Sequence, residues 1–297
     1  MTDMNIEQHL QEAAERVEAR LSALTDTTFD EYPSLTAAIR YSLLSGGKRI
    51  RPYLTLAFCD LFGGNPSAAL DFGCALEMIH TYSLIHDDLP CMDDDALRRG
   101  KPTNHVVYGE ATAVLAGDAL LTEAFSVVTT ADISAEVSTA AVRLLAQAAG
   151  MHGMIGGQMI DLRGEEDRLD FDALLEMHAK KTGALIRAAC LLGCLSAGIT
   201  DPTDIRYQAA ITYASNIGLA FQVIDDRLDA IGSVEELGKP IGSDKEQGKT
   251  TFLSFMTADQ AYDYARDLTD QAKDAVALFA GREKLVDLAD LLLNRTH

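Results

Sequence analysis

Apolar residues recur at intervals of three and four along most of this 297-residue chain, and breaks rich in glycine, proline and serine separate the repeats. Such spacing is typical of amphipathic helices, and no stretch alternates apolar and polar residues as a half-buried strand does. The predicted helices cover residues 5–24, 34–44, 52–62, 67 to the acidic run at Pro90, 111–130, 134–150, 170–197, 204–231, 258–280 and 281–295. Because no boundary divides them, we expect one all-α domain over residues 1–297.

Glycine, proline and serine mark the ends of these helices. Ser34 is expected to cap one helix, and Pro52 suits the first turn of the next. The segment 232–248 holds four glycines and Pro240, which interrupt regular structure, so we expect a mobile loop there. The absence of a Gly-rich strand–turn–helix motif in the sequence argues against Rossmann and P-loop nucleotide sites.

The chain is strongly acidic, with 45 acidic and 25 basic residues and a formal net charge of −20. This balance argues against nucleic acid or an anionic membrane as the main partner. Several of the scarce cations are grouped, in Lys48–Arg51, Arg98–Lys101 and Lys180–Lys181. Grouped cations in an acidic protein suggest a reserved site for an anion.

The cysteines and the apolar runs indicate where the protein resides. Five cysteines are scattered without a CxxC pair, as expected for reduced thiols in the cytoplasm. The first ten residues do not read as a signal peptide. The run 188–199 is too short to span a bilayer. We therefore expect a cytoplasmic protein without stable membrane insertion.

Two acidic clusters, each preceded by an apolar helical run, carry the strongest chemical signal. They are His86–Asp95 and Phe221–Asp229. If the clusters face each other, their carboxylates repel unless cations lie between them, and Mg²⁺ is the natural cation for oxygen ligands. Mg²⁺ held by few carboxylates keeps open positions that phosphate oxygens fill, so a phosphorylated substrate is expected.

Spacing within the clusters selects some ligands and leaves others open. Asp225 and Asp229 are one helical turn apart and share a face, with Asp226 beside them. Asp87 and Asp94 would share a face of an ideal helix, but Pro90 breaks that geometry. Spacing therefore leaves the choice between Asp93 and Asp94 open. His80 lies seven residues before Asp87, on the face that leads to the cluster.

Several ordered motifs resemble those of trans-prenyltransferases, closest to bacterial-type farnesyl diphosphate synthases. They are Gly46–Pro52, Glu77–Thr103, Gly157–Leu162, Lys181–Ile186, Phe221–Asp226 and Gly238–Thr250. The resemblance implies antiparallel helices around a central cavity, a homodimer and three Mg²⁺ ions. It also implies condensation of isopentenyl diphosphate with dimethylallyl and geranyl diphosphates.

The resemblance also implies roles for individual residues. Asp87, Asp88 and Asp93 would hold one pair of Mg²⁺, and Asp225 with Asp226 and Asp229 the third. The allylic diphosphate would contact Arg98, Lys181 and Lys239, with Lys249 in the same Gly-rich region. Isopentenyl diphosphate would contact Lys48, Arg51, His80 and Arg99. The path of the carbocation would be lined by Thr182, Phe221 and Gln222.

Product length is expected to be mainly C15, with geranylgeranyl and geranyl diphosphate synthases as alternatives. Ser83, one turn before Asp87, leaves room for a growing tail. Tyr82 stands where the family's farnesyl synthases often carry an aromatic floor. Ideal helix geometry turns Tyr82 about 140° away from Asp87, so its role rests on the resemblance.

One residue departs from the family pattern, and three other classes of protein compete. Arg227 replaces an apolar residue after the paired aspartates, and it would weaken the third metal if it turned inward. A class I terpene cyclase typically lacks the second aspartate cluster and the Gly46–Arg51 segment. A non-catalytic prenyltransferase subunit tends to lose one cluster, and a metal-buffering scaffold would not need the grouped cations.

Overall fold

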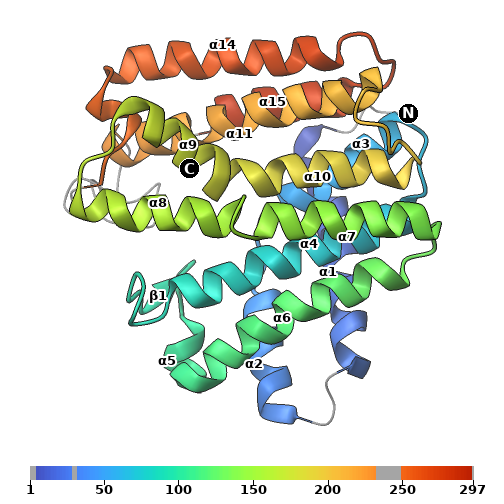
Figure 1. The fold of residues 1–297 in the computed structure, drawn as a ribbon, viewed down its shortest axis with the longest axis vertical. Helices are drawn as coiled ribbons and strands as arrows, with labels where there is room; N and C mark the ends of the chain where they lie inside the picture. Colours follow the sequence, from blue (N-terminus) through green and yellow to red (C-terminus); the bar gives the residue numbers. More distant parts are fainter. Residues whose placement is uncertain (1–4, 29–31, 232–248, 296–297) are drawn as a thin grey trace.

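The computed structural model describes residues 5–28, 32–231 and 249–295, and these residues form an all-α fold (Figure 1). The helices are α1 (Ile6–Thr28), α2 (Pro33–Leu43), α3 (Ile50–Leu61), α4 (Pro66–Asp87), α5 (Asn104–Tyr108), α6 (Glu110–Thr130), α7 (Ala135–Ala149), α8 (Met154–Glu166), α9 (Phe171–Lys181), α10 (Gly183–Ser196), α11 (Ile205–Ile231), α14 (Ala258–Val276) and α15 (Glu283–Leu293). A 3₁₀ helix spans Phe252–Ser254, and strands β1 (Leu97–Arg98) and β2 (Lys101–Pro102) form a small antiparallel hairpin.

The helices lie side by side in tiers, from α14 at the top of Figure 1 to α6 and α2 at the bottom. The main hydrophobic core joins α3, α4, α6, α7 and α10, and a smaller one joins α9, α11, α14 and the 3₁₀ helix. Gly193 lets α10 approach α3 closely, because a Cβ there would lie 2.6 Å from the carbonyl oxygen of Thr55. The two cores together hold the ends of α4, α9 and α11 in place.

Most predicted helices are confirmed, and the differences have local causes. The second helix begins at Pro33 with Tyr32 as its cap, so the prediction of Ser34 as the cap was wrong. The predicted helix 170–197 is two helices that break at Thr182. The prediction missed α8, whose first turn contains two poor helix formers, Gly156 and Gly157. The predicted loop 232–248, including Lys239, lies outside the described residues.

A buried ion pair fixes the start of α3. Arg49 precedes α3 with a left-handed backbone (φ 46°), and its side chain is 2% exposed. Its guanidinium donates to Glu77 of α4 at 2.7 Å and to the carbonyl of Leu43 at 2.7 Å. Since a buried guanidinium needs such partners, the pair sets how the Lys48–Arg51 segment meets α4.

A buried histidine links α9 to the segment that follows residue 248. The ring of His178 stacks on Phe252, with centroids 5.1 Å apart and planes 17° apart. Burial lowers the pKa of His178 to about 4. The imidazole is therefore neutral at neutral pH, and it packs like an aromatic side chain three residues before Lys181.

We predict that Glu77→Ala lowers the free energy of unfolding by about 3–5 kcal/mol, because it leaves the Arg49 charge buried without its partner. Urea denaturation followed by circular dichroism measures this. The control is Glu18→Ala, since Glu18 is 41% exposed and lies 3.5 Å from Arg49; its effect should stay within about 1 kcal/mol. Equal effects of the two variants would contradict the structural role of the buried pair.

We predict that His178 makes the protein less stable in mild acid. Its pKa in the folded protein lies below the unfolded value, so unfolded chains bind more protons and stability falls as pH drops from about 6.5 towards 4. The loss at pH 5 relative to pH 7.5 should be about 2 kcal/mol. Urea unfolding curves measure this loss, which should be absent in His178→Phe. If the variant loses the same stability between pH 7.5 and pH 5, a group other than His178 causes it.

Candidate active site

The first acidic cluster folds back on the end of α4. α4 ends at Asp87, and the backbone N–H of Asp93 donates to the carbonyl of Asp87 at 2.9 Å. Asp94 instead donates to the carbonyl of Leu89, with a left-handed backbone (φ 52°). The structure thus brings Asp93, and not Asp94, back to Asp87.

Asp87 lies in a setting that favours a cation. Burial raises its pKa to about 6; the nearby charge of Lys181 lowers it and that of Asp93 raises it. A carboxylate with a raised pKa is one whose negative charge is incompletely compensated. A bound cation would complete that compensation.

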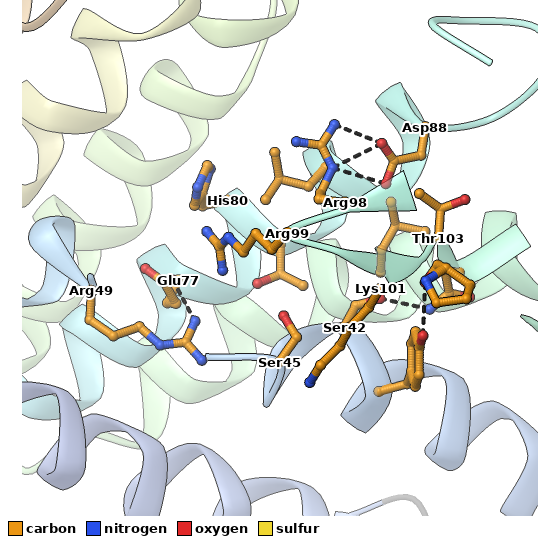
Figure 2. A pocket seen from close by; sticks show the side chains of 16 residues that line it. Ser42, Ser45, Arg49, Glu77, His80, Asp88, Arg98, Arg99, Lys101 and Thr103 are labelled. Carbon is orange, nitrogen blue, oxygen red and sulfur yellow. Dashed lines mark hydrogen bonds and ion pairs between the residues drawn. The ribbon is translucent and has the colours of Figure 1, made fainter. Parts of the chain in front are cut away.

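Asp88 points to the hairpin instead. Arg98 donates to it through Nε at 2.9 Å and through Nη2 at 2.6 Å, and Asp88 is buried (Figure 2). The two hydrogen bonds between Arg98 and Asp88 fix the direction of the β1–β2 hairpin. Arg99 and Gly100 in its turn have left-handed backbones, with φ of 52° and 74°. In the described structure Asp88 therefore holds Arg98, and its predicted contact with metal stays a prediction.

Two adjacent residues at a helix break lie near the two acidic clusters. Lys181 ends α9 and donates to Asp161 of α8 at 2.5 Å; burial lowers its pKa, but Asp161 and then the charges of Asp87 and Asp93 raise it above its ordinary value. The next residue, Thr182, lies at the break between α9 and α10. The break explains why two adjacent side chains can serve both acidic clusters.

Thr182 reaches α11 from this break. Its hydroxyl donates to Gln222 at 2.8 Å, and the Gln222 amide donates to Asp225 at 3.1 Å. Lys181 thus lies near the cluster of α4, and Thr182 near that of α11. The expectation that the clusters face one cavity agrees with this path.

In the second cluster, Arg227 turns away from the carboxylates. Its Nε donates to the carbonyl of Ala258, and its guanidinium lies 5.2 Å from the ring centroid of Tyr262 on α14. Asp226 accepts the backbone N–H of Phe252 at 2.8 Å. Arg227 is therefore not positioned to oppose a metal ion, and Asp226 helps to dock the 3₁₀ helix.

A pocket rich in cations lies beside these clusters. His80 and Arg99 point into it next to the Arg49–Glu77 pair (Figure 2). Burial and the charges of surrounding arginines lower the pKa of His80 far below its ordinary value, and burial also lowers the pKa of Arg51. Nε of Arg51 is buried with no hydrogen-bond partner in the described chain. Cations that raise each other's energy in this way favour binding of an anion.

Glycine is required where this pocket meets the segment before α3. Arg99 donates to the carbonyl of Gly46 at 2.5 Å, and a Cβ on Gly47 would lie 2.6 Å from Nη1 of Arg99. Gly47 also has φ 136°, which disfavours other residues. The Gly46–Gly47 pair thus lets backbone and guanidinium pack together, while Lys48 follows directly.

The oxygen donors suit Mg²⁺, but they do not form a complete cage. Within the described ranges, no three His, Cys, Asp or Glu side chains converge on one point. Mg²⁺ binds to one or two carboxylates and completes its shell with water and phosphate oxygens. The donor set fits Mg²⁺ that arrives with a diphosphate, and Asp87, Asp93 and Asp225 are the carboxylates that would hold it.

Some predicted residues lie elsewhere, and some functional candidates were missed. Phe221 lines a second cavity with Lys48, and Lys249 lies 4.0 Å from Glu165. The missed candidates are Asp161, His178 and Arg295. Asp161 and His178 stand in or beside quoted motifs, whereas an arginine near the C-terminus gives no spacing signal.

Comparison with known proteins identifies the family. Residues 32–279 match the polyprenyl synthetase family. The chain is 47% identical over 264 residues to a geranylgeranyl diphosphate synthase of Cyanophora paradoxa, covering 88% of this chain and 87% of the relative. It is 42% identical over 288 residues to a farnesyl diphosphate synthase of Bacillus subtilis, covering 95% of each.

A solved structure agrees. The crystal structure of an FPP/GFPP synthase from Zymomonas mobilis matches with a TM-score of 0.86 at 35% identity, covering 97% of this chain and 98% of that one. The all-α prediction and the resemblance read from the motifs are confirmed, and a metal-buffering scaffold is excluded. The chain belongs to the polyprenyl synthetase family and is a prenyltransferase of isoprenoid biosynthesis.

Proposed function

We propose that this enzyme is a cytoplasmic farnesyl diphosphate synthase, which condenses isopentenyl diphosphate with dimethylallyl and then geranyl diphosphate. The observation that carries the proposal is that two sites suited to a diphosphate lie side by side. One is the pair of acidic clusters joined through Lys181, Thr182 and Gln222, and the other is the cationic pocket beside them. Relatives from Bacillus subtilis and Escherichia coli carry the farnesyl name.

In the proposed mechanism, the residues divide the reaction between the two sites. Bound Mg²⁺, three ions per site as in the family, supplies positive charge to the leaving diphosphate. Lys181 and Arg98, with Lys239 as a further proposal, contact the allylic diphosphate as its C–O bond breaks. Thr182 and Gln222 present oxygen dipoles towards the allylic carbocation.

The cationic pocket holds the second substrate. Lys48, Arg51, His80 and Arg99 bind the diphosphate of isopentenyl diphosphate, so that its double bond faces the cation. The double bond supplies the electron pair for the new C–C bond, and the adjacent carbon then loses a proton. The released diphosphate accepts that proton in our proposal, because no side chain stands out as the base.

The proposed product is tested directly by incubating the enzyme with labelled isopentenyl diphosphate and geranyl diphosphate, with and without Mg²⁺. Chromatography of the products should show Mg²⁺-dependent C15. Predominant C20 would replace the farnesyl proposal with the geranylgeranyl alternative, and no condensation product would contradict both.

We predict that Asp93→Asn lowers turnover by at least about 100-fold, because it removes a carboxylate that supports the developing diphosphate charge. The matched control is Asp94→Asn, which should retain near-normal turnover because Asp94 folds away from Asp87. Steady-state release of diphosphate measures both. Similar losses in the two variants would show that the loop rearranges and that the choice of Asp93 is wrong.

The face of α4 that bears Ser83 differs from the face that bears Tyr82. Ser83 is half-buried and donates to the carbonyl of His80. Tyr82 packs edge-on against His86, with ring centroids 5.7 Å apart. Nε2 of His86 donates to the carbonyl of Val114 on α6 at 3.0 Å, and a Cβ on Gly117 would lie 2.1 Å from that nitrogen. Tyr82 therefore belongs to the α4–α6 contact, as ideal helix geometry predicts, and its effect on product length remains a proposal.

We predict that Ser83→Phe shortens the main product to C10, because the ring fills the space one turn from Asp87. Tyr82→Ala should lengthen it to C20 or more by opening the floor next to α6. The controls Ser83→Ala and Tyr82→Phe should keep C15, since they leave the volume nearly unchanged. Products of each variant are compared by chromatography; C15 from Tyr82→Ala would assign the floor to another side chain.

We also propose a homodimer formed by the face that includes α5, α6 and the start of α8. Seven of the twelve exposed large apolar residues in the described structure fall between Val106 and Met159. By length and composition α6 could cross a membrane, but apolar helices of soluble proteins meet the same test. Exposed apolar side chains gathered on α5, α6 and the start of α8 suit a second copy of the chain.

We predict that Leu115→Asp weakens the dimer, because Leu115 on α6 is 57% exposed and would place a buried charge in the interface. Leu278→Asp is the control, since Leu278 is 80% exposed and lies on a different part of the chain. Light scattering after size exclusion measures the mass. If Leu115→Asp forms a dimer as stable as that of the wild type, the interface does not include this part of α6.

A further inference from the structure

Arg295, which follows α15, is held against the second acidic cluster. Its Nη2 donates to Asp225 at 2.5 Å and to the carbonyl of Phe221 at 2.9 Å. Its guanidinium carbon lies 3.8 Å from the centroid of the Phe221 ring. The side chain is only 10% exposed, and its Nε is buried with no partner in the described residues. Several contacts and burial distinguish this pair from an ordinary surface ion pair.

The contact occupies the carboxylate where a metal would bind. One oxygen of Asp225 accepts from Gln222 and the other from Arg295. A guanidinium and a divalent cation repel each other when they share one carboxylate at short range. The charge that neutralises Asp225 in the described structure therefore also opposes a metal ion at that position.

The structure leaves room for Arg295 to move without leaving its support. A cavity of about 560 Å³ lies beside it, lined in part by Lys48, Phe221 and Leu292. The guanidinium could shift into this space while it stays over the Phe221 ring. Burial and then the positive charge of Arg295 lower the pKa of Lys48, while the charge of Asp225 raises it, so Lys48 and Arg295 lie in one shared electrostatic environment.

We infer that Arg295 is a positioning residue that serves as a provisional counter-ion for Asp225. It weakens divalent-cation binding at the second cluster until a diphosphate brings the compensating negative charge. Binding of metal and of diphosphate at this cluster is thereby coupled. The inference rests on the proposed function, in which Asp225 is a metal ligand.

The test is a Mn²⁺ titration of the full-length protein, with free Mn²⁺ measured by electron paramagnetic resonance, in the presence and absence of inorganic pyrophosphate. In wild type, pyrophosphate should strongly tighten Mn²⁺ binding. In Arg295→Gln, binding without pyrophosphate should tighten at least about fivefold, and the enhancement by pyrophosphate should shrink by a similar factor, because the opposing charge is gone. Arg295→Lys keeps the charge and should resemble wild type.

Two results would overturn the inference. One is an Arg295→Gln titration that matches wild type in both conditions, and the other is weaker Mn²⁺ binding by that variant without pyrophosphate. Asp225→Asn separates this failure from failure of the proposed metal site, because it should remove the pyrophosphate-dependent Mn²⁺ site of the second cluster and leave the binding at Asp87 and Asp93. If Asp225→Asn binds Mn²⁺ as wild type does, the ligand assignment and the inference both fall. Helical circular dichroism and melting temperatures confirm that each variant is folded.

Discussion

The site depends on one electrostatic constraint: the partly buried carboxylates at the ends of α4 and α11 need positive charge close to them. Fixed cations that come from separate segments supply part of that charge. Lys181 ends α9, Arg98 lies on the hairpin, and Arg295 follows α15. Because no two of these cations belong to the same element, the charge pattern exists only when the whole bundle is assembled.

The arginines of one short cationic run differ in their surroundings. In Lys48–Arg51, Arg49 is committed to Glu77 and the carbonyl of Leu43. Arg51 has a buried Nε without a partner among the described residues, and burial and then the positive charge of Arg99 lower its pKa. One arginine therefore holds the segment on α4, and this leaves the other positively charged and available for an anion.

The sequence was sufficient for the helical fold, for the two acidic clusters and for the cationic groups, because periodicity and charge are local signals. Spacing alone could not choose between Asp93 and Asp94, since that choice depends on α4 ending at Asp87 and the chain folding back, and only the resemblance favoured Asp93. The direction of Arg227 depends on α14, which packs against α11 only in the folded chain. Arg295 was missed for the same reason, because its partner lies 70 residues away.

The ring of His86 lies directly against Gly117, which ties α6 to the end of α4 one residue before Asp87. A methyl group added at Gly117 would overlap the His86 ring, so either the ring would leave the carbonyl of Val114 or α6 would shift. Residue 117 therefore constrains the position of the Asp87 carboxylate from a different helix, and a substitution there would act on the reaction through position and not through contact with substrate.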